Sequence, residues 1–316
     1  MPKLEAAALI IHGGAGMIGP ASERPGRKRA MMKALKTGAA ILRKGGSALD
    51  AVMASVVILE DDPLFNAGFG STLNVDGAVE MDASVMFATP TRNREGEATA
   101  TAGAVAAVSR IRNPVILARA VMEYTPHIMM AGVGAEHFAN SVGIKLCAPA
   151  ELISDRARER WRLRREKPNP KVKHGTVGAA AIDARGQLAA ATSTGGVPGK
   201  MAGRVGDSAI IGAGTFASAW GAASATGHGE AIMMASLCRE TVEAFGASSP
   251  TRVAQIKVAE LIAPQGYEAG IILVDRNRRV GYAHNAETME VGIFHSSSGL
   301  THRWAEPMPM LRKPRI

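Results

Sequence analysis

Two threonines, Thr176 and Thr194, are the first residues whose type and spacing could support catalysis. Thr176 follows His174-Gly175 and opens an apolar run, and Thr194 closes a second run just before Gly195-Gly196. The turn Asp183-Ala184-Arg185-Gly186 between the runs predicts a hairpin that brings the two hydroxyls together. Paired hydroxyls beside glycines are an arrangement that catalysis can use. Threonine also favours strands for its shape alone, so a purely structural interpretation stays open at this point.

A basic and an acidic residue three positions apart could bind an amino acid. Arg204 and Asp207 lie among glycines in Gly203-Arg204-Val205-Gly206-Asp207-Ser208. A guanidinium offers a planar fork that matches a carboxylate, and an aspartate can accept hydrogen bonds from an ammonium group. Together the two side chains would bind the α-carboxylate and the α-amine of a substrate. They could equally pair with each other.

Two glycine-containing turns suggest sites for an anion or oxyanion. Thr226-Gly227-His228-Gly229-Glu230 opens a predicted helix, and backbone N–H groups at such a start suit developing negative charge. The predicted strand Ala7–His12 runs into Gly13-Gly14, which is typical of an esterase oxyanion loop. That class also needs a Gly-x-Ser-x-Gly elbow, which the sequence lacks. His12 is therefore either catalytic or a structural hydrogen-bonding residue.

Hydrophobic periodicity and turn signals predict the helices and strands that must position these residues. The helix after Gly45-Gly46 has a capping-box-like start, Ser47 with Asp50 three residues later. The predicted helices are Lys28–Lys44, Ser47–Leu59, Asn113–Tyr124, Gly134–Asn140, Ala225–Phe245 and Thr251–Ala263. The predicted strands are Ala7–His12, a hairpin within Leu73–Met86, Ala102–Ser109, Ile128–Met130, Thr176–Ile182, Gln187–Thr194, Ala209–Phe216, Gly270–Asp275, Arg279–His284 and Val291–Phe294.

Three further stretches are expected to lie outside regular structure. Leu59–Gly70 reads as a turn-rich loop whose carbonyl groups could surround a cation or serve the fold alone. Arg92–Thr101 is polar and is expected to be an exposed excursion, and Met308–Ile316 is expected to be a loose tail.

The composition indicates a globular enzyme-sized chain. Its 316 residues suffice for one large α/β domain or two smaller ones. We expect no membrane span, because no apolar run reaches 18 residues, and the N-terminus lacks a signal-peptide profile. Cys147 and Cys238 show no metal-ligand spacing, and two thiols without a partner motif favour a reducing cytoplasm.

The net charge of +9 is concentrated in one segment rather than spread over a binding face. Residues 151–173 hold nine Lys and Arg residues against four acids, and Pro168-Asn169-Pro170 follows the charged run. A charge run that ends in prolines is typical of a solvated linker. No helix-turn-helix, zinc-finger or RNA-binding signature accompanies it, so nucleic acid is not an expected partner.

Six separated motifs, in one order along the chain, resemble the plant-type L-asparaginase and isoaspartyl peptidase group of N-terminal-nucleophile (Ntn) hydrolases. The motifs are Ile11-His12-Gly13-Gly14-Ala15-Gly16, Pro63-Leu64-Phe65-Asn66-Ala67-Gly68, His174-Gly175-Thr176-Val177-Gly178-Ala179, Ala191-Thr192-Ser193-Thr194-Gly195-Gly196, Gly203-Arg204-Val205-Gly206-Asp207-Ser208 and Thr226-Gly227-His228-Gly229-Glu230. The similarity extends over most of the chain.

The resemblance implies an α+β fold, a four-layer αββα sandwich, in a precursor that cuts itself between Gly175 and Thr176. Residues 1–150 would form the N-terminal (alpha) half of a single domain, 151–175 a basic flexible linker, and 176–316 the C-terminal (beta) half. The freed α-amine of Thr176 could then act as general base for its own hydroxyl, since such an amine has a pKa of about 7.7–8.0. The resemblance also implies a cytoplasmic homodimer of alpha-beta units, with no membrane or nucleic-acid partner.

The resemblance assigns roles to individual residues. Thr176 would be the nucleophile, with Thr194 as its hydrogen-bond partner and Asn66 near the site. Thr226 and Gly227 would form the oxyanion hole, and Arg204, Asp207, Gly195 and Gly229 would bind the substrate. No cofactor is expected for catalysis. Members of the family often bind a structural sodium ion, here through the backbone carbonyls of Glu60, Phe65, Ala67 and Phe69.

The expected substrates are L-asparagine and β-aspartyl (isoaspartyl) dipeptides, with release of L-aspartate. Two alternatives remain, a glycosylasparaginase-like amidase and a non-cleaving homologue that binds amino acids. Glycosylasparaginases typically carry Asp before the nucleophile, where this chain has Gly175. The chain departs from the family pattern in its longer Thr89–Thr101 segment and at Glu268-Ala269, so the substrate range is less constrained than the mechanism.

Overall fold

The computed structural model describes residues 6–16, 20–92, 98–166, 175–246 and 248–308. Its larger sheet has eight strands in the order β12-β11-β1-β5-β6-β2-β3-β4, and only the pair β3 and β4 is parallel. In that order, the strands are Gly299–Ala305, Met289–His295, Ala8–Ala15, Val177–Ile182, Leu188–Thr194, Met81–Arg92, Ala98–Val108 and Met129–Ala131. The antiparallel smaller sheet has the order β10-β9-β8-β7, which are Val280–His284, Ala269–Asp275, Gly221–Gly227 and Thr215–Ser218.

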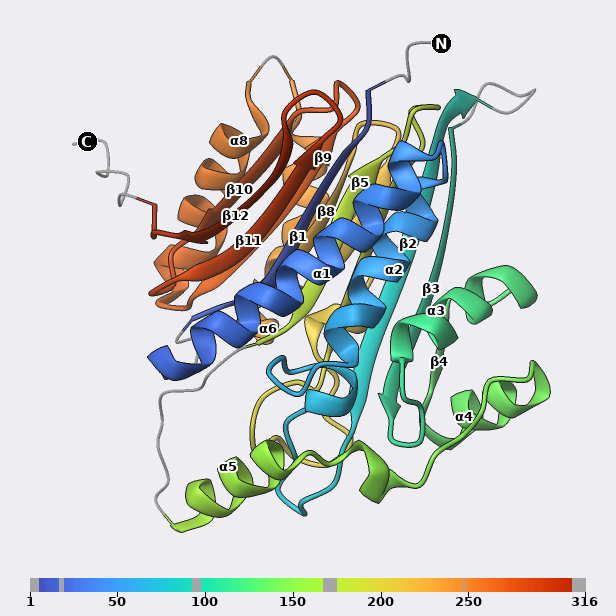
Figure 1. Ribbon diagram of the computed structural model, residues 1–316, viewed down its shortest axis with the longest axis vertical. Coiled ribbons are helices and arrows are strands. Elements are labelled where there is room, and N and C mark those ends of the chain that lie inside the picture. The colour runs from blue at the N-terminus through green and yellow to red at the C-terminus, as the bar shows by residue number, and fades with distance from the viewer. Residues whose placement is uncertain (1–5, 17–19, 93–97, 167–174, 247, 309–316) are drawn as a thin grey trace.

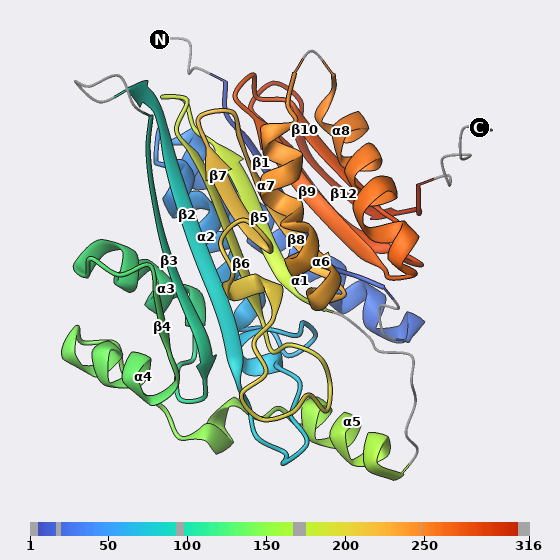
Figure 2. The same ribbon diagram turned by 180° about the vertical axis from the view of Figure 1, so that it is seen from behind.

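Helices cover the outer face of each sheet, which gives four layers. Figure 1 shows α1 (Arg24–Arg43) and α2 (Ala48–Glu60) lying across the larger sheet, with α3 (Pro114–Tyr124) beside them. Figure 2 shows the opposite side, where α6 (Gly229–Ala235), α7 (Leu237–Glu243) and α8 (Pro250–Lys257) cover the smaller sheet. The expected α+β sandwich of αββα type is confirmed.

Three hydrophobic cores separate the four layers. One lies between α1–α3 and the larger sheet, one between the two sheets, and one between the smaller sheet and α6–α8. Small residues face each other in the central hairpin, where Ala180 and Ala181 of β5 pair with Ala190 and Ala189 of β6. A β-carbon at Gly178 would come within 2.0 Å of the Ser224 hydroxyl across the gap between the sheets. The central strands therefore pack face to face with no room for a larger side chain there.

The hairpin that carries the two threonines has the predicted register. Val177 of β5 pairs with Ser193 of β6, so Thr176 and Thr194 lie at the same end of the hairpin. The cap at the start of α2 is also as predicted, because the Ser47 hydroxyl accepts a hydrogen bond from the Asp50 N–H.

Several predicted elements were wrong. The strand expected at Ala209–Phe216 is instead a short turn region followed by β7 and β8, and β12 was not predicted. The helix expected through Phe245 is broken at Ser236, whose backbone is left-handed with φ 46° and ψ 46°. Ala98–Thr101 belong to strand β3 rather than to an excursion, while residues 93–97 and 309–316 lie outside the described parts of the chain.

The segment expected to be a flexible linker contains a docked helix, α5 (Asp155–Glu166). Its Trp161 indole N–H donates to the Asn74 carbonyl at 2.9 Å, and the ring packs against Gly77. Arg156 pairs with Glu23 at 2.6 Å. These contacts hold the helix against the body of the domain, so the linker prediction was wrong for α5, while residues 167–174 are not described. Within the described ranges, no helix is long and apolar enough to cross a bilayer.

Candidate active site

The Thr176 hydroxyl lies 3.2 Å from the Thr194 hydroxyl, with both residues almost fully buried. Thr194 Oγ1 also accepts a hydrogen bond from the Gly196 N–H at 3.0 Å. Because an N–H already donates to Thr194, that hydroxyl has a defined orientation toward Thr176. The sequence prediction that the hairpin brings these two groups together is confirmed by this geometry.

The peptide bond before Thr176 is enclosed by two segments from the N-terminal half, the end of β1 and the loop after α2. The Asn66 N–H donates to the Gly175 carbonyl at 3.3 Å. On another side, Gly14 has φ +108°, and a β-carbon there would lie 2.9 Å from Gly175 Cα. Gly175 itself could carry no side chain, because a β-carbon would contact Asn66 Cβ at 2.9 Å. These two close approaches explain why glycine occupies both positions.

Asn66 is fixed by four hydrogen bonds around the same site. In addition to its N–H bond, its side-chain amide donates to the Gly196 carbonyl at 2.7 Å and accepts from the Thr72 N–H at 2.8 Å. Its carbonyl accepts from the Gly195 N–H at 3.0 Å. Asn66 thus links the loop after α2 to the glycine pair that follows Thr194.

A narrow cavity of about 10 Å³, room for about one water molecule, brings together most of the predicted site residues. The lining residues are Gly175, Thr176, Thr194, Gly196, Val197, Arg204, Asp207, Gly227 and Gly229. Gly196 and Val197 were not predicted. Three predicted site residues, Gly195, Asn66 and Thr226, are not among the residues that line this cavity. Since Gly175 forms part of the wall, the cavity is bounded on one side by the residue that precedes Thr176.

Arg204 pairs with Glu230 rather than with Asp207. Its Nη2 and Nε lie 2.7 Å and 3.0 Å from Glu230 Oε1. The sequence reasoning left open a pair between Arg204 and Asp207, and that pair does not form. Glu230 was missed as a partner, although it stands in the motif that starts at Thr226, in the first turn of α6.

The Asp207 carboxylate is buried beside the cavity, and its Oδ2 has no hydrogen-bond partner among the described residues. Burial raises the pKa of Asp207 to about 7, although the nearby Arg204 charge opposes the shift. An unpartnered buried carboxylate oxygen is costly unless a donor arrives to satisfy it. Gly229 allows such an approach, because a β-carbon there would sit 2.9 Å from Asp207 Oδ1 and 2.7 Å from Arg204 Nη2.

The loop that carries Arg204 is held by a second buried carboxylate, Asp82. Its two oxygens accept from the Gly206 N–H and the Ala107 N–H, each at 2.9 Å. Burial is the main cause of a raised pKa at Asp82, and the Lys200 charge works against it. Asp82 was not predicted as a site residue, because its role depends on a contact 124 positions away in the chain.

The predicted oxyanion residues lie at the end of β8. Gly227 lines the cavity with φ +138°, a conformation that disfavours any side chain. The fully buried Thr226 hydroxyl accepts from the Ala15 N–H at 3.3 Å. Thr226 therefore connects the end of β8 to the end of β1, next to Gly14.

In the loop predicted to hold a cation, two glycines lie against carbonyl groups that were expected to be ligands. A β-carbon at Gly68, which has φ +53°, would lie 2.4 Å from the Glu60 carbonyl oxygen. One at Gly70 would lie 2.0 Å from the Phe65 carbonyl oxygen. Both glycines thus leave space in front of carbonyls that face into the loop. The Ala67 carbonyl accepts from the Gly70 N–H at 3.1 Å, and a carbonyl oxygen has a second lone pair for another partner.

His12 takes part in a buried chain of hydroxyl groups between the two sheets. Its Nε2 lies 2.9 Å from the Ser224 hydroxyl, which in turn lies 2.7 Å from Thr192. Thr192, Thr215 and Ser84 continue the chain at 2.6 Å and 2.7 Å. Burial lowers the pKa of His12 to about 3, so the ring is neutral. The structural interpretation of His12 is therefore the one that its surroundings favour.

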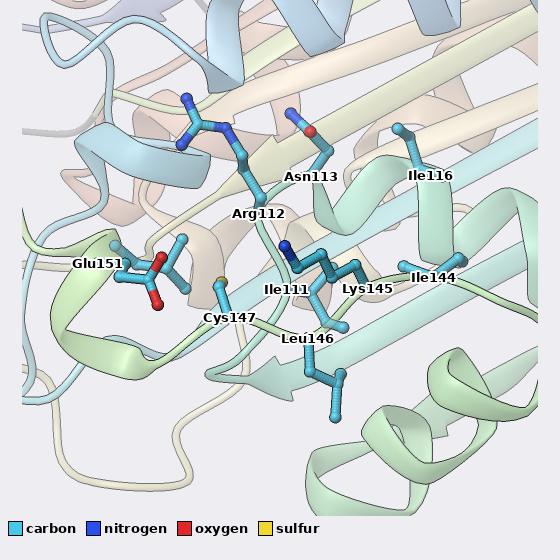
Figure 3. A pocket seen from close by; sticks show the side chains of 10 residues that line it. Ile111, Arg112, Asn113, Ile116, Ile144, Lys145, Leu146, Cys147 and Glu151 are labelled. Atoms are coloured by element: carbon cyan, nitrogen blue, oxygen red, sulfur yellow. The ribbon is translucent and has the colours of Figure 1, made fainter.

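A larger cavity of about 420 Å³ lies elsewhere, between the start of α3 and the segment around Lys145 (Figure 3). Lys145 lies there among the side chains of Ile111, Ile116 and Leu146, whereas Arg112, also a lining residue, pairs with Asp61 at 3.0 Å. It shares no lining residue with the cavity at Thr176. Its size alone does not make it the reactive site, because it lacks a nucleophile paired with a second hydroxyl.

Comparison with known proteins gives consistent results. The profile of a family described as asparaginase matches residues 5–302. The chain is 43% identical over 276 residues to an isoaspartyl peptidase/L-asparaginase of Danio rerio, covering 85% of this chain and 86% of that protein. A protein of the same name from Xenopus laevis is 39% identical over 93% of this chain and 97% of its own length. The Homo sapiens protein of that name is 45% identical over 74% of this chain and 75% of its own.

Proposed function

The chain belongs to the asparaginase family of Ntn hydrolases, and from this premise we propose that it is a self-cleaving threonine amidohydrolase. Its substrates would be L-asparagine and β-aspartyl dipeptides, as the names of its relatives suggest for those proteins. The single observation that carries the proposal is the Thr176 hydroxyl, 3.2 Å from Thr194 and directly after the enclosed Gly175 peptide.

The first step is cleavage before Thr176. The Thr176 hydroxyl oxygen attacks the Gly175 carbonyl carbon, a C–O bond forms, and the peptide C–N bond breaks with transfer of the hydroxyl proton to the leaving nitrogen. Water then hydrolyses the resulting ester, which restores the hydroxyl and frees the Thr176 α-amine. The Asn66 N–H supports this step, since it already donates to the Gly175 carbonyl oxygen on which negative charge develops.

The second step is amide hydrolysis by the freed residue. The neutral α-amine of Thr176 accepts the proton of its own hydroxyl, and the oxygen attacks the side-chain carbonyl carbon of the substrate. The amide C–N bond breaks, the amine leaves with the proton, and an ester of aspartate remains on Thr176. Water hydrolyses that ester and releases L-aspartate. Thr194 orients the nucleophile, and Gly227 with Thr226 provides the oxyanion site.

Arg204 and Asp207 bind the amino-acid end of the substrate in this proposal. The α-carboxylate displaces Glu230 from Arg204, and the α-ammonium group supplies the donor that Asp207 Oδ2 lacks. Gly195 and Gly229 leave space for the aspartyl backbone. An ammonium group beside Asp207 also favours its ionised form, so binding and deprotonation of this carboxyl are coupled.

We further propose a structural sodium ion in the loop after α2. The carbonyl oxygens of Glu60, Phe65, Ala67 and Phe69 would hold it, and oxygen ligands of this kind suit a hard cation. A bound ion would fix the loop that carries Asn66. No cofactor takes part in the proposed chemistry. A cytoplasmic homodimer, in which each unit consists of both fragments, completes the proposal.

Mass spectrometry and an activity assay test the proposed function together. Purified protein should contain a fragment that starts at Thr176 and should release ammonia from asparagine and leucine from β-aspartyl-leucine. Thr176→Ala should remain one chain without activity, because no hydroxyl is left to attack Gly175. An intact wild-type chain that still hydrolyses asparagine would overturn the self-cleavage step.

A further inference from the structure

A buried arginine outside the cavity, Arg27 of α1, connects three distant segments. Its Nε lies 3.0 Å from Glu290 Oε2, its Nη1 donates to the Leu64 carbonyl at 2.6 Å, and its Nη2 donates to the Gly13 carbonyl at 2.6 Å. Its guanidinium also lies over the Phe65 ring, 4.2 Å from the centroid. Only 5% of Arg27 is exposed, so each of these contacts is formed away from bulk water.

The carboxylate that holds Arg27 is fixed in its turn. Glu290 of β11 is fully buried, and its other oxygen, Oε1, lies 2.9 Å from His302 Nε2 on the neighbouring strand β12. Both carboxylate oxygens are therefore engaged. Burial lowers the pKa of Arg27, and the Glu290 charge counteracts that effect. An arginine remains charged in such a setting, and its planar fork can serve several acceptors at once.

The two carbonyls that Arg27 binds belong to the end of β1 and to the loop after α2, the two segments that enclose the peptide bond before Thr176. Gly13 directly precedes Gly14, whose backbone packs against Gly175. Leu64 precedes Asn66 by two residues, and Asn66 donates to the Gly175 carbonyl. The Arg27 guanidinium thus links the end of β1 to the loop after α2, the two segments that each contact Gly175.

The packing around Gly13 shows how closely this arrangement is built. A β-carbon at Gly13 would lie 2.7 Å from Phe65 Cε1 and 3.1 Å from both Arg27 Nη2 and Glu290 Oε2. The end of β1 therefore packs directly against both the loop that carries Asn66 and the buried Arg27–Glu290 pair. Because these groups are in close contact, we expect a displacement of the Arg27 guanidinium to move the end of β1, the loop after α2, or both.

We propose that Arg27, anchored by Glu290, is a positioning residue that holds Gly13–Gly14, at the irregular end of β1, and the Leu64–Asn66 loop at a fixed separation around Thr176. This inference rests on the proposed function for its kinetic consequences. It predicts that Arg27 acts on the rate of self-cleavage and on turnover, because small displacements of reacting groups are costly. It predicts little effect on substrate affinity, because Arg27 does not line the cavity that contains Arg204 and Asp207.

A double variant separates positioning from simple charge balance. Arg27→Met alone leaves Glu290 buried without its cation, which is expected to destabilise the fold. Arg27→Met combined with Glu290→Gln removes both charges, so the melting temperature should return close to that of wild type. The Gly13 and Leu64 carbonyls still lose their shared donor. We expect self-cleavage and kcat of the double variant to fall about tenfold to a hundredfold, with KM for asparagine within about twofold.

The control is Arg279→Met in the smaller sheet. Arg279 resembles Arg27 in its contacts, because it pairs with Asp275 at 2.7 Å and donates to the Ser248 carbonyl at 3.2 Å, but it touches neither of the two segments. This variant should lose stability while its folded fraction cleaves and turns over at the wild-type rate. If the double variant does not fold, Arg27→Lys carries the test, since it keeps the charge but cannot reach all three acceptors, and the same slowing is expected.

Amide hydrogen exchange supplies a readout that does not depend on activity. In a Thr176→Ala background, removal of Arg27 should increase exchange at the Asn66 N–H, which is bonded to Gly175. Wild-type rates of cleavage and exchange in the double variant would overturn the positioning role. A wild-type protein that neither cleaves nor hydrolyses asparagine would instead overturn the proposed function, and the exchange result would still decide the role of Arg27.

Discussion

Arg204 Nη2 lies 2.7 Å from Glu230 Oε1, so the guanidinium assigned to the substrate is already paired with a carboxylate of the chain. The Glu230 side chain is 52% exposed and that of Arg204 only 17%. Glu230 can therefore swing into water when a substrate carboxylate arrives, whereas Arg204 stays in place. A half-exposed ion pair of this kind is worth up to about 1 kcal/mol.

Glu230→Gln should lower KM for asparagine about two- to fivefold and leave kcat unchanged, because the competing charge is removed. Arg204→Ala should act in the opposite direction, reducing kcat/KM about tenfold to a hundredfold or more through the loss of a charged hydrogen-bond donor. Steady-state kinetics on the two variants measure both effects. A higher KM in Glu230→Gln would mean that Glu230 holds Arg204 in its productive position.

Asp207→Asn should stabilise the fold in alkaline solution. The pKa of the Asp207 carboxyl is 3.8 in the unfolded chain and about 7 in the folded protein. Its contribution to the free energy of unfolding therefore falls as pH rises from about 4 to 7 and stays low above that range. The variant should gain up to about 4 kcal/mol at pH 8 and almost nothing at pH 4.

Thermal melts at the two pH values test this expectation, with Asp76→Asn at an exposed turn as the control that should shift neither. Asp207→Asn should also lose most activity, since it no longer carries the charge for the substrate ammonium group. Equal melting temperatures of wild type and Asp207→Asn at pH 8 would contradict the account of a strained buried carboxyl.

The linkage of the substrate should matter more than its leaving group. In β-aspartyl-leucine the aspartyl α-carboxylate is free to bind Arg204, whereas in α-aspartyl-leucine that group is part of the peptide bond. A site whose buried polar group loses its partner discriminates by a factor on the order of 10⁴. We expect leucine release from the β-linked isomer and almost none from the α-linked one. Comparable turnover of the two isomers would contradict the proposal that Arg204 and Asp207 bind the α-carboxylate and the α-ammonium group of the substrate.

Ser236→Gly should raise the melting temperature without changing activity. Ser236 is an exposed residue between α6 and α7 with φ 46°, and a left-handed backbone costs a residue with a side chain about 1–2 kcal/mol. Glycine removes most of that strain, although its greater freedom in the unfolded chain offsets part of the gain. Ser236→Ala is the matched control, since it keeps a β-carbon and should give no stabilisation.

Local signals predicted the site best where residues close in sequence determine its geometry. The turn at Asp183–Gly186 defines the hairpin, and with it the meeting of Thr176 and Thr194, without help from the rest of the chain. The capped start of α2 is equally local. The break at Ser236 could not be predicted, because the apolar residues Leu237 and Val242 continue the helical pattern past it.

Contacts between distant residues were not predictable from the same patterns. Arg27 stands in a basic stretch at the start of α1 and reads as one more solvated charge. Its burial depends on Glu290, which lies 263 positions further along the chain. Arg204 lines the cavity at Thr176, but its partner Glu230 was not predicted, because Glu230 and Asp207 have the same chemistry and only the fold decides between them.

The strand order of the larger sheet has a consequence for the two fragments that the proposed cleavage before Thr176 would produce. Strands β12 and β11 belong to the second fragment, β1 to the first, β5 and β6 to the second, and β2, β3 and β4 to the first. Strands of the two fragments thus alternate within one hydrogen-bonded sheet, so the fragments can separate only if that sheet unfolds. The uncleaved precursor folds in a unimolecular reaction, whereas two separate fragments would have to associate in order to refold. Denatured mature enzyme should accordingly refold with a yield that depends on concentration, whereas the Thr176→Ala chain should not.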